Sequence, residues 1–128
     1  MRLQHLNLAT SDVAALAAFF ERFFGFTPYA ARGDALVVLR NKDDFILTVM
    51  RNKRGEPADY PGIFHVGFYY DTVGEIEAKH AELSAAGLSP KKIAFMERGG
   101  GIRVPHFYCP APGNILIEVC MPPGGLTS

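Results

Sequence analysis

The sequence predicts an α+β fold made of two βαβββ repeats, whose curved mixed sheets surround a cup and carry their helices on the outer face. Two observations lead to this fold class. Strand and helix patterns follow one another in the same order twice, over about residues 1–52 and again over about residues 62–121. Each predicted helix also ends at a glycine, Gly25 or Gly87, a residue that stops helices well. We therefore expect residues 1–128 to form a single duplicated domain.

A histidine occupies the same place in each repeat. His5 lies seven residues before Asp12, where the first helix is expected to start. His65 lies seven residues before Thr72, where the second helix is expected to start. This spacing is far longer than a solenoid repeat, so it indicates a duplicated half-domain.

Hydrophobic periodicity predicts the elements of the first repeat. Val13, Leu16 and Phe20 recur at helical spacing, which predicts a helix over residues 13–24 that buries this stripe against a sheet. Alternating apolar residues bounded by turn residues predict the strands, over residues 3–9, 27–31, 35–40 and 45–51.

The second repeat begins its helix with a capping box, because Glu75 follows Thr72 by three residues. The buried stripe of this helix is expected to contain Val73, Ile76, His80 and Leu83. The same alternation as before predicts strands over residues 63–70, 91–96, 103–109 and 115–121. No regular element is expected after residue 121.

Composition and charge exclude several classes of protein. Lys plus Arg and Asp plus Glu number 13 each, so no basic excess points to nucleic acid. The apolar stretches fall far short of the roughly 20 residues that a membrane span needs, and the first residues lack the order of a signal peptide. Cys109 and Cys120 lie in apolar strand patterns and are expected to be reduced core residues. We expect a cytoplasmic protein with no nucleic-acid or membrane partner.

The polar residues of three predicted strands are expected to share the cup. Strand alternation places His5 and Asn7 on the face away from the apolar residues of their strand. By the same alternation, His65 and Tyr69 share one face of the strand over 63–70, and Glu118 lies opposite the isoleucines of the last strand. Because the helices need the apolar faces, these other faces would line the cup.

Glu118 is the most informative of these residues. It is a charged residue in the middle of the apolar run Ile-Leu-Ile-Glu-Val. Burying an unpaired carboxylate at such a position would cost roughly several kcal/mol. A basic partner or a metal ion resolves that cost, and two histidines with one carboxylate can hold Fe(II), Mn(II), Zn(II), Ni(II) or Co(II). A lone His or Glu in a strand is usually satisfied or solvent-facing, but two equivalent histidines with a carboxylate favour the metal site.

Three segments of the chain, over residues 5–12, 23–26 and 107–118, resemble the vicinal oxygen chelate superfamily. This superfamily includes glyoxalase I, extradiol catechol dioxygenases, fosfomycin-resistance transferases and bleomycin-binding proteins. The resemblance implies paired βαβββ units, a homodimer in which two chains often complete each cup, and a divalent metal ion. It places the metal ligands at three positions of this sequence, His5, His65 and Glu118.

Departures from the superfamily pattern narrow the activity that the resemblance implies. Glyoxalase I has a further Glu in the strand that corresponds to residues 45–49, where this chain has no carboxylate. Tyr108 lies ten residues before Glu118 and four before Pro112, as in the extradiol dioxygenases. Those enzymes also carry a His several residues before the Tyr, where this chain has Gly99-Gly100-Gly101. The match to the dioxygenases is therefore partial.

Two residues of the strand over 103–109 are candidates for catalysis. Tyr108 would donate a proton or a hydrogen bond to a bound oxygen, and His106, with the same strand parity, would act as general acid or base. The alternatives are that Tyr108 only packs and that His106 lies at a strand edge. The candidate substrate contacts are Asn7, Tyr69 and Arg103, for which an inert or solvated position is the alternative.

The sequence thus predicts a divalent-metal-dependent enzyme that acts on a small oxygen-chelating substrate, by extradiol-dioxygenase-like or lyase-like chemistry. The alternative is a metal-free protein that sequesters flat small molecules, as the bleomycin-binding relatives do, using its many aromatic residues. The presence of all three candidate ligands favours the enzyme.

Overall fold

A computed structural model describes residues 1–123 of the chain; the last part of the segment expected to lack regular elements, residues 124–128, lies outside the described residues. The chain divides into two compact units. The first contains Met1–Tyr60 with Pro112–Asn114, and the second contains Pro61–Ala111 with the chain from Ile115 onward. Each unit is described by itself below.

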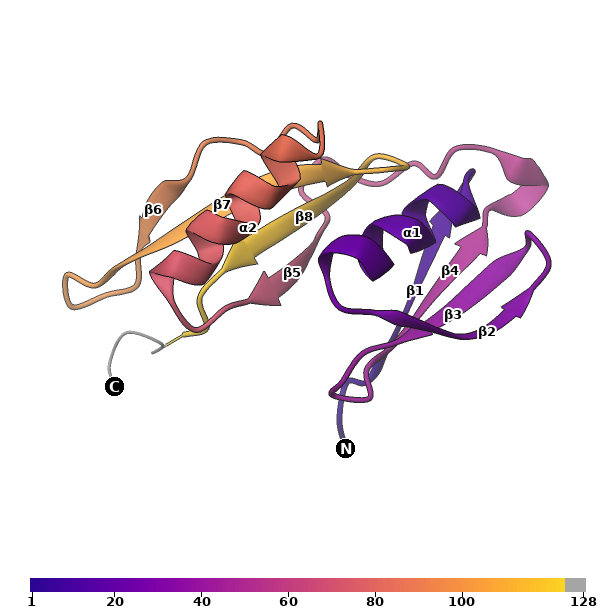
Figure 1. Ribbon diagram of the computed structural model, residues 1–128, viewed down its shortest axis with the longest axis horizontal. Helices are drawn as coiled ribbons and strands as arrows, with labels where there is room; N and C mark the ends of the chain where they lie inside the picture. The colour runs from indigo at the N-terminus through magenta and orange to yellow at the C-terminus, as the bar shows by residue number, and fades with distance from the viewer. Residues whose placement is uncertain (124–128) are drawn as a thin grey trace. The chain divides into compact units, whose positions relative to one another are not determined.

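The first unit is a four-stranded mixed sheet with one helix (Figure 1). Its elements are β1 (His5–Thr10), α1 (Val13–Phe23), β2 (Thr27–Arg32), β3 (Leu36–Arg40) and β4 (Ile46–Arg51). The strand order is β1-β4-β3-β2, with β1 parallel to β4 and the other pairs antiparallel. A short 3-10 helix (Lys53–Gly55) follows β4.

The second unit repeats this arrangement (Figure 1). Its elements are β5 (His65–Tyr69), α2 (Val73–Ala85), β6 (Ala94–Glu97), β7 (Arg103–Ala111) and β8 (Ile115–Cys120). The order is β5-β8-β7-β6, again with one parallel pair, β5 and β8. The predicted α+β fold of two βαβββ repeats is therefore confirmed, with β6 starting three residues later and β7 ending two residues later than expected.

Helix α1 is held by its cap and by an aromatic core. The Asp12 carboxylate accepts the backbone N–H of Ala15 at 3.0 Å, which satisfies one free donor at the helix start. The predicted stripe is buried, and Leu16 and Phe20 have no exposed surface. Fully burying one such side chain contributes about 1.5–3 kcal/mol. The helix ends where Gly25 takes a positive φ of 70°.

Helix α2 has a narrower buried stripe than the sequence pattern predicts. Thr72 caps it by accepting the backbone N–H of Glu75 at 3.1 Å, and Ile76 and Leu83 are fully buried. The prediction is wrong at Val73, which is 37% exposed because it lies in the first turn, ahead of the two buried anchors. His80 is partly buried, and its Nε2 donates to the Lys91 carbonyl at 2.9 Å.

The first unit also contains a close approach between a turn and a buried threonine. Gly113 has a φ of 85°, and a Cβ there would lie 2.7 Å from Thr10 Oγ1. Thr10 has no exposed surface, and its hydroxyl is fixed because it accepts the Asp12 N–H at 3.1 Å. Only glycine therefore fits this turn without strain.

We expect Gly113→Ala to lower the free energy of unfolding by about 2 to 3 kcal/mol, through left-handed strain and the clash with Thr10. Gly33→Ala is the matched control, because Gly33 has a φ of 52° but nothing within 4 Å of the added Cβ. The control should cost only about 1 kcal/mol. Urea unfolding of both variants measures the difference, and equal losses would show that the contact with Thr10 carries no energy.

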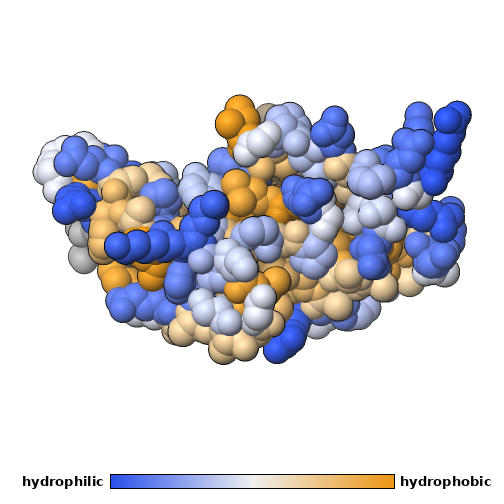
Figure 2. Space-filling view, turned by 90° about the horizontal axis from the view of Figure 1, so that it is seen from above, coloured by the Kyte–Doolittle hydropathy of each residue, from blue (hydrophilic) through white to orange (hydrophobic). Residues whose placement is uncertain are grey.

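The surface mixes hydrophilic and hydrophobic side chains over the face that Figure 2 shows. Exposed large hydrophobic residues include Leu3 and Ile63, each 87% exposed, and Tyr69, which is 61% exposed. Within residues 1–123, no helix is long and apolar enough to cross a membrane.

Candidate functional site

The common strand order of the two units shows which residues are equivalent. In the first sheet, Asn7 on β1 lies beside Thr48 on β4. In the second, Gly67 on β5 lies beside Glu118 on β8. Asn7 and Gly67 each follow the repeat-equivalent histidine by two residues, so Thr48 is the counterpart of Glu118. The first repeat has a hydroxyl where the second has a carboxylate.

The neighbouring strand differs in the same way. Val38 on β3 lies beside Thr48, whereas Tyr108 on β7 lies beside Glu118. The second repeat therefore has the phenol of Tyr108 and the carboxylate of Glu118 where the first repeat has Val38 and Thr48. The titratable groups of the candidate site are concentrated in the second unit.

These groups lie on the sheet face opposite α2. The ring of Phe107 contacts His80 of α2, with ring centroids 4.9 Å apart, so odd-numbered residues of β7 face the helix. His106 and Tyr108 consequently face away from it. On β8, Ile117 is fully buried while Glu118 keeps 14% of its side chain exposed. The strand faces predicted from alternation are confirmed here.

Glu118 lies between two histidines. His65 Nε2 is 3.8 Å from Glu118 Oε1, and His106 Nδ1 is 3.7 Å from Glu118 Oε2. The His65 side chain is 38% exposed and that of His106 17% exposed. His106 Nδ1 is buried and has no hydrogen-bond partner within residues 1–123. One carboxylate thus has a histidine nitrogen near each of its oxygens.

Tyr108 completes the surroundings of the carboxylate. Its hydroxyl donates a hydrogen bond to Glu118, and this bond, followed by burial and the Glu118 charge, raises the pKa of Tyr108 to about 12. Its ring lies edge-on to the rings of His65 and His106, with each centroid 5.6 Å away. The phenol is therefore fixed in place and stays protonated at neutral pH.

Cys120 belongs to the same group, although the sequence pattern indicated only a core residue. Its Sγ lies 3.5 Å from Glu118 Oε1. Burial is the main cause that raises the pKa of this thiol to about 11, and the Glu118 charge adds to it, while Arg98 acts in the opposite direction. Strand parity with Glu118 was the signal in the sequence that could have identified it. We call Glu118, His65, His106, Tyr108 and Cys120 the Glu118 cluster.

His65 is oriented as a metal ligand would be. Its Nδ1–H donates to the Ile63 carbonyl at 3.0 Å, so the neutral ring carries its lone pair on Nε2, toward Glu118. Metal-binding histidines typically have such a backbone partner on their other nitrogen. Two ligands about 2.1 Å from one ion lie about 3.0 to 3.4 Å apart. Nε2 and Oε1 are 3.8 Å apart, so they would move together by about 0.4 Å or more to share an ion. Across residues 1–123, however, no three His, Cys, Asp or Glu side chains are arranged to hold an ion.

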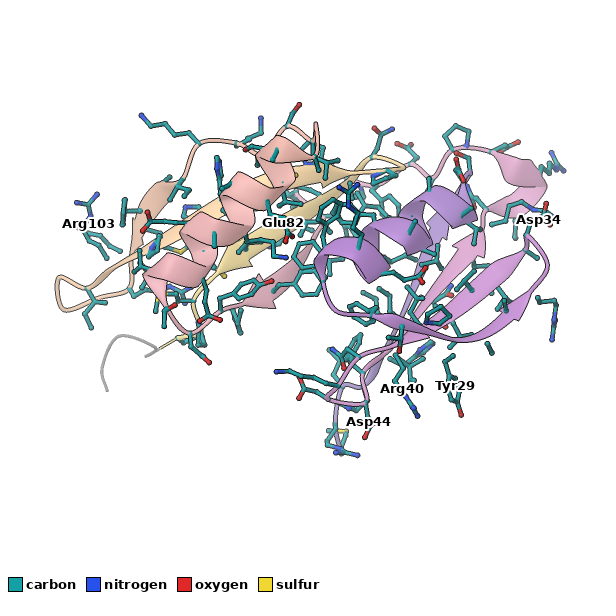
Figure 3. The ribbon with its side chains drawn as sticks, in the orientation of Figure 1. Tyr29, Asp34, Arg40, Asp44, Glu82 and Arg103 are labelled. Carbon is teal, nitrogen blue, oxygen red and sulfur yellow. The ribbon has the colours of Figure 1, made fainter. Side chains whose placement is uncertain are left out.

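The remaining predicted site residues are not part of the Glu118 cluster. His5 and Asn7 are exposed on β1 of the first unit. Tyr69 lies beside Cys120 in the β5–β8 register and is exposed. Arg103 points outward beside β6 (Figure 3), and its guanidinium carbon lies 5.4 Å from the centre of the Phe95 ring. The structure thus brings together His65, His106, Tyr108 and Glu118, and separates Arg103 from them.

Three solved structures illustrate the similarity of this chain to known folds. A structure described as a possible glyoxalase from Bacillus cereus is 35% identical, with 94% of this chain and 98% of that chain covered and a TM-score of 0.79. Lactoylglutathione lyase from Agrobacterium tumefaciens is 19% identical, with 98% and 95% covered and a TM-score of 0.76. A mutant fosfomycin resistance protein from Listeria monocytogenes is 16% identical, with 97% and 93% covered and a TM-score of 0.79.

The comparison with protein families extends over most of the sequence. No curated protein matches the chain significantly. A family model described as the Glyoxalase/Bleomycin resistance protein/Dioxygenase superfamily matches residues 2–119, which include both repeats and every residue of the Glu118 cluster except Cys120. The chain therefore belongs to the Glyoxalase/Bleomycin resistance protein/Dioxygenase superfamily.

Proposed function

We propose that the protein is a divalent-metal-dependent enzyme that acts on a small substrate with two adjacent oxygen atoms. The observation that carries this proposal is the position of Glu118 beside the lone pair of His65 Nε2, on the sheet face opposite α2. A carboxylate and a neutral imidazole at this spacing are a donor pair for Fe, Mn, Zn, Ni or Co. The Listeria structure was solved with Mn(II) and a dihydroxypropylphosphonic acid, which supports a metal-dependent role within this fold.

His65 and Glu118 would hold the ion together with His5. His5 is proposed because it stands at the position equivalent to His65 in the first repeat and matches a ligand position of the superfamily. When bound, the ion would polarise the substrate oxygens and stabilise negative charge that develops on them. The first repeat has Thr48 in place of the carboxylate, so we propose one ion per chain rather than two.

Two residues of the Glu118 cluster would handle protons. Tyr108 keeps its proton over the physiological pH range, so it would act as a hydrogen-bond donor to a substrate oxygen rather than as a base. The His106 ring has its Nδ1 3.7 Å from Glu118 Oε2, and we propose that this ring moves a proton to or from the substrate. Asn7 and Tyr69 would contact the substrate. This chemistry suits either an extradiol-dioxygenase-like or a lyase-like reaction.

Metal content tests the proposal directly. We expect protein purified without a chelator or an affinity metal to carry about one divalent ion per chain, by elemental analysis. His65→Ala should lose this ion on dialysis, because it removes a ligand whose lone pair faces Glu118. His80→Gln is the control, since His80 lies on α2, facing away from Glu118, and its Nε2 bonds the Lys91 carbonyl. Iron would direct assays to dioxygenation, and zinc, nickel or manganese to lyase and transferase reactions.

A second function, metal-free binding of flat small molecules, has its own observation. Ile63, just before β5, is 87% exposed, and Tyr69, within β5, is 61% exposed. Aromatic and apolar surface of this kind suits planar ligands. Wild-type protein that takes up none of the five metals, even when each is added back, would contradict the enzyme and support this alternative.

A further inference from the structure

Arg98 is held next to the Glu118 cluster by the end of the β6–β7 hairpin. Its backbone N–H donates to the Ile102 carbonyl at 2.8 Å, which closes the turn formed by the three glycines. Its Nη2 donates to the Met121 carbonyl at 3.1 Å, just beyond β8. Backbone and side chain are thus both anchored, so the guanidinium needs little ordering to meet a ligand.

The guanidinium lies on the same sheet face as the Glu118 cluster. Met96 pairs with Val104 in the β6–β7 register, which places even-numbered residues of β6 on the face of His106. Arg98 continues this alternation, and its guanidinium lies near enough to the Cys120 thiol to lower the pKa of that thiol. Because Cys120 Sγ also contacts Glu118 Oε1 at 3.5 Å, one side chain separates Arg98 from the proposed metal ligand.

Among the described residues, no acidic side chain forms an ion pair with this cation. Within residues 1–123, no carboxylate lies within 4 Å of the Arg98 guanidinium, and its Nε is buried without a hydrogen-bond partner. A buried donor without a partner is costly, and a charged one more so. An anionic ligand would therefore supply a counter-charge that the described residues do not.

The charge of the loaded site points in the same direction. Histidines bind metals as neutral groups, so a divalent ion (+2), Glu118 (−1) and Arg98 (+1) sum to +2. Such a site favours a substrate whose own charge is negative. A neutral chelating molecule would leave the Arg98 charge without a partner.

From these observations we propose that Arg98 binds an acidic group of the substrate, so that the site takes small organic acids with adjacent oxygen atoms. Chelating oxygens would face the metal, and a carboxylate, phosphonate or phosphate oxygen would face the guanidinium. This inference rests on the proposed function, which it deepens by naming the class of substrate. A purely structural Arg98, which only ties the hairpin to the end of β8, is the competing explanation.

Two chelating probes separate these explanations in titrations of metal-loaded protein. Oxalate offers adjacent oxygens and further anionic oxygens, whereas acetohydroxamate offers adjacent oxygens and only a methyl group beyond them. We expect Arg98→Gln to weaken oxalate binding about tenfold or more and acetohydroxamate binding by no more than about threefold. Gln keeps a donor for the Met121 carbonyl, and Arg98→Lys, which keeps the charge, should retain most of the oxalate affinity.

Lys92→Gln is the control. It removes the same charge from the same unit, but Lys92 is exposed on the chain that leads into β6 and has no assigned role, so oxalate affinity should stay within about twofold. The proposal is overturned if Arg98→Gln weakens both probes equally, if it weakens neither, or if Lys92→Gln weakens oxalate as much. The same oxalate titrations of metal-free protein give an independent test. If no metal binds, the proposed function fails, but a tenfold Arg98-dependent loss of oxalate binding would still support the anion site.

Discussion

Replacing Glu118 with glutamine is expected to lower the affinity for a divalent ion by about a thousandfold or more. Loss of a residue that merely supports a ligand already costs about 10- to 100-fold in metal affinity. Glu118 is the only anionic ligand of the proposed site, so its loss removes both a donor and the charge that offsets the ion. A competition titration against a metal-binding dye measures the change.

The structure supplies a matched control for this variant in the other repeat. Thr48→Val changes the residue of the first repeat that is equivalent to Glu118. Thr48 is 8% exposed and lies beside Val38, whereas Glu118 lies beside Tyr108. Metal affinity should not change in this variant. Glu118→Gln should also leave the thermal midpoint of metal-free protein nearly unchanged, because the amide oxygen still accepts from Tyr108. Retention of wild-type affinity by Glu118→Gln would remove Glu118 from the site.

Most of the fold could be predicted because its signals are local. The spacing of Leu16 and Phe20 defines the buried side of α1, and alternation along Ile115 to Cys120 defines the two faces of β8. Positions with weaker local signals were the ones missed. Val73 fits the apolar period of α2 but lies in its first turn, where the sheet does not cover it.

The composition of the candidate site was only partly predictable, because it depends on strand order. Alternation places His106, Tyr108 and Glu118 on polar faces, but only the pairing of β8 with both β5 and β7 brings His65 and His106 to the two oxygens of Glu118. Cys120 has the same parity as Glu118, yet its type and its apolar neighbours favoured the core interpretation. Its contact with the carboxylate follows from the fold.

The choice between Arg98 and Arg103 also depends on strand pairing, which the sequence alone does not define. Both flank the three-glycine turn, and the sequence gives no reason to prefer either as an anion-binding residue. The register, with Glu97 beside Arg103 and Met96 beside Val104, places them on opposite faces of the hairpin. The sequence-based prediction placed a substrate contact at Arg103, whereas the charge that lowers the pKa of the Cys120 thiol comes from Arg98.

We expect access to Glu118 to depend on the absence of a side chain at Gly67. This glycine lies beside Glu118 in the β5–β8 register, and a Cβ built there would be 4.0 Å from Glu118 Oε1. We expect Gly67→Leu to lower metal affinity by about a hundredfold, because its branched end would extend over the carboxylate and an ion would have to displace it. Gly67→Ala is the graded control, since 4.0 Å is an ordinary contact distance and affinity should change by no more than about threefold.

The same pair of variants separates loss of access from loss of fold. Any L-residue in a regular strand has less conformational entropy to lose than glycine, so both variants should be as stable as the wild type or about 0.5 to 1 kcal/mol more stable. Urea unfolding of metal-free protein measures this, and calorimetric titration with the ion measures affinity. A Gly67→Leu protein that binds the ion as tightly as wild type would mean that the ion reaches Glu118 from its Oε2 side, where His106 and not His65 would be the neighbouring ligand. Lost affinity with retained stability would instead support the open space beside Gly67 as the approach to the His65–Glu118 pair.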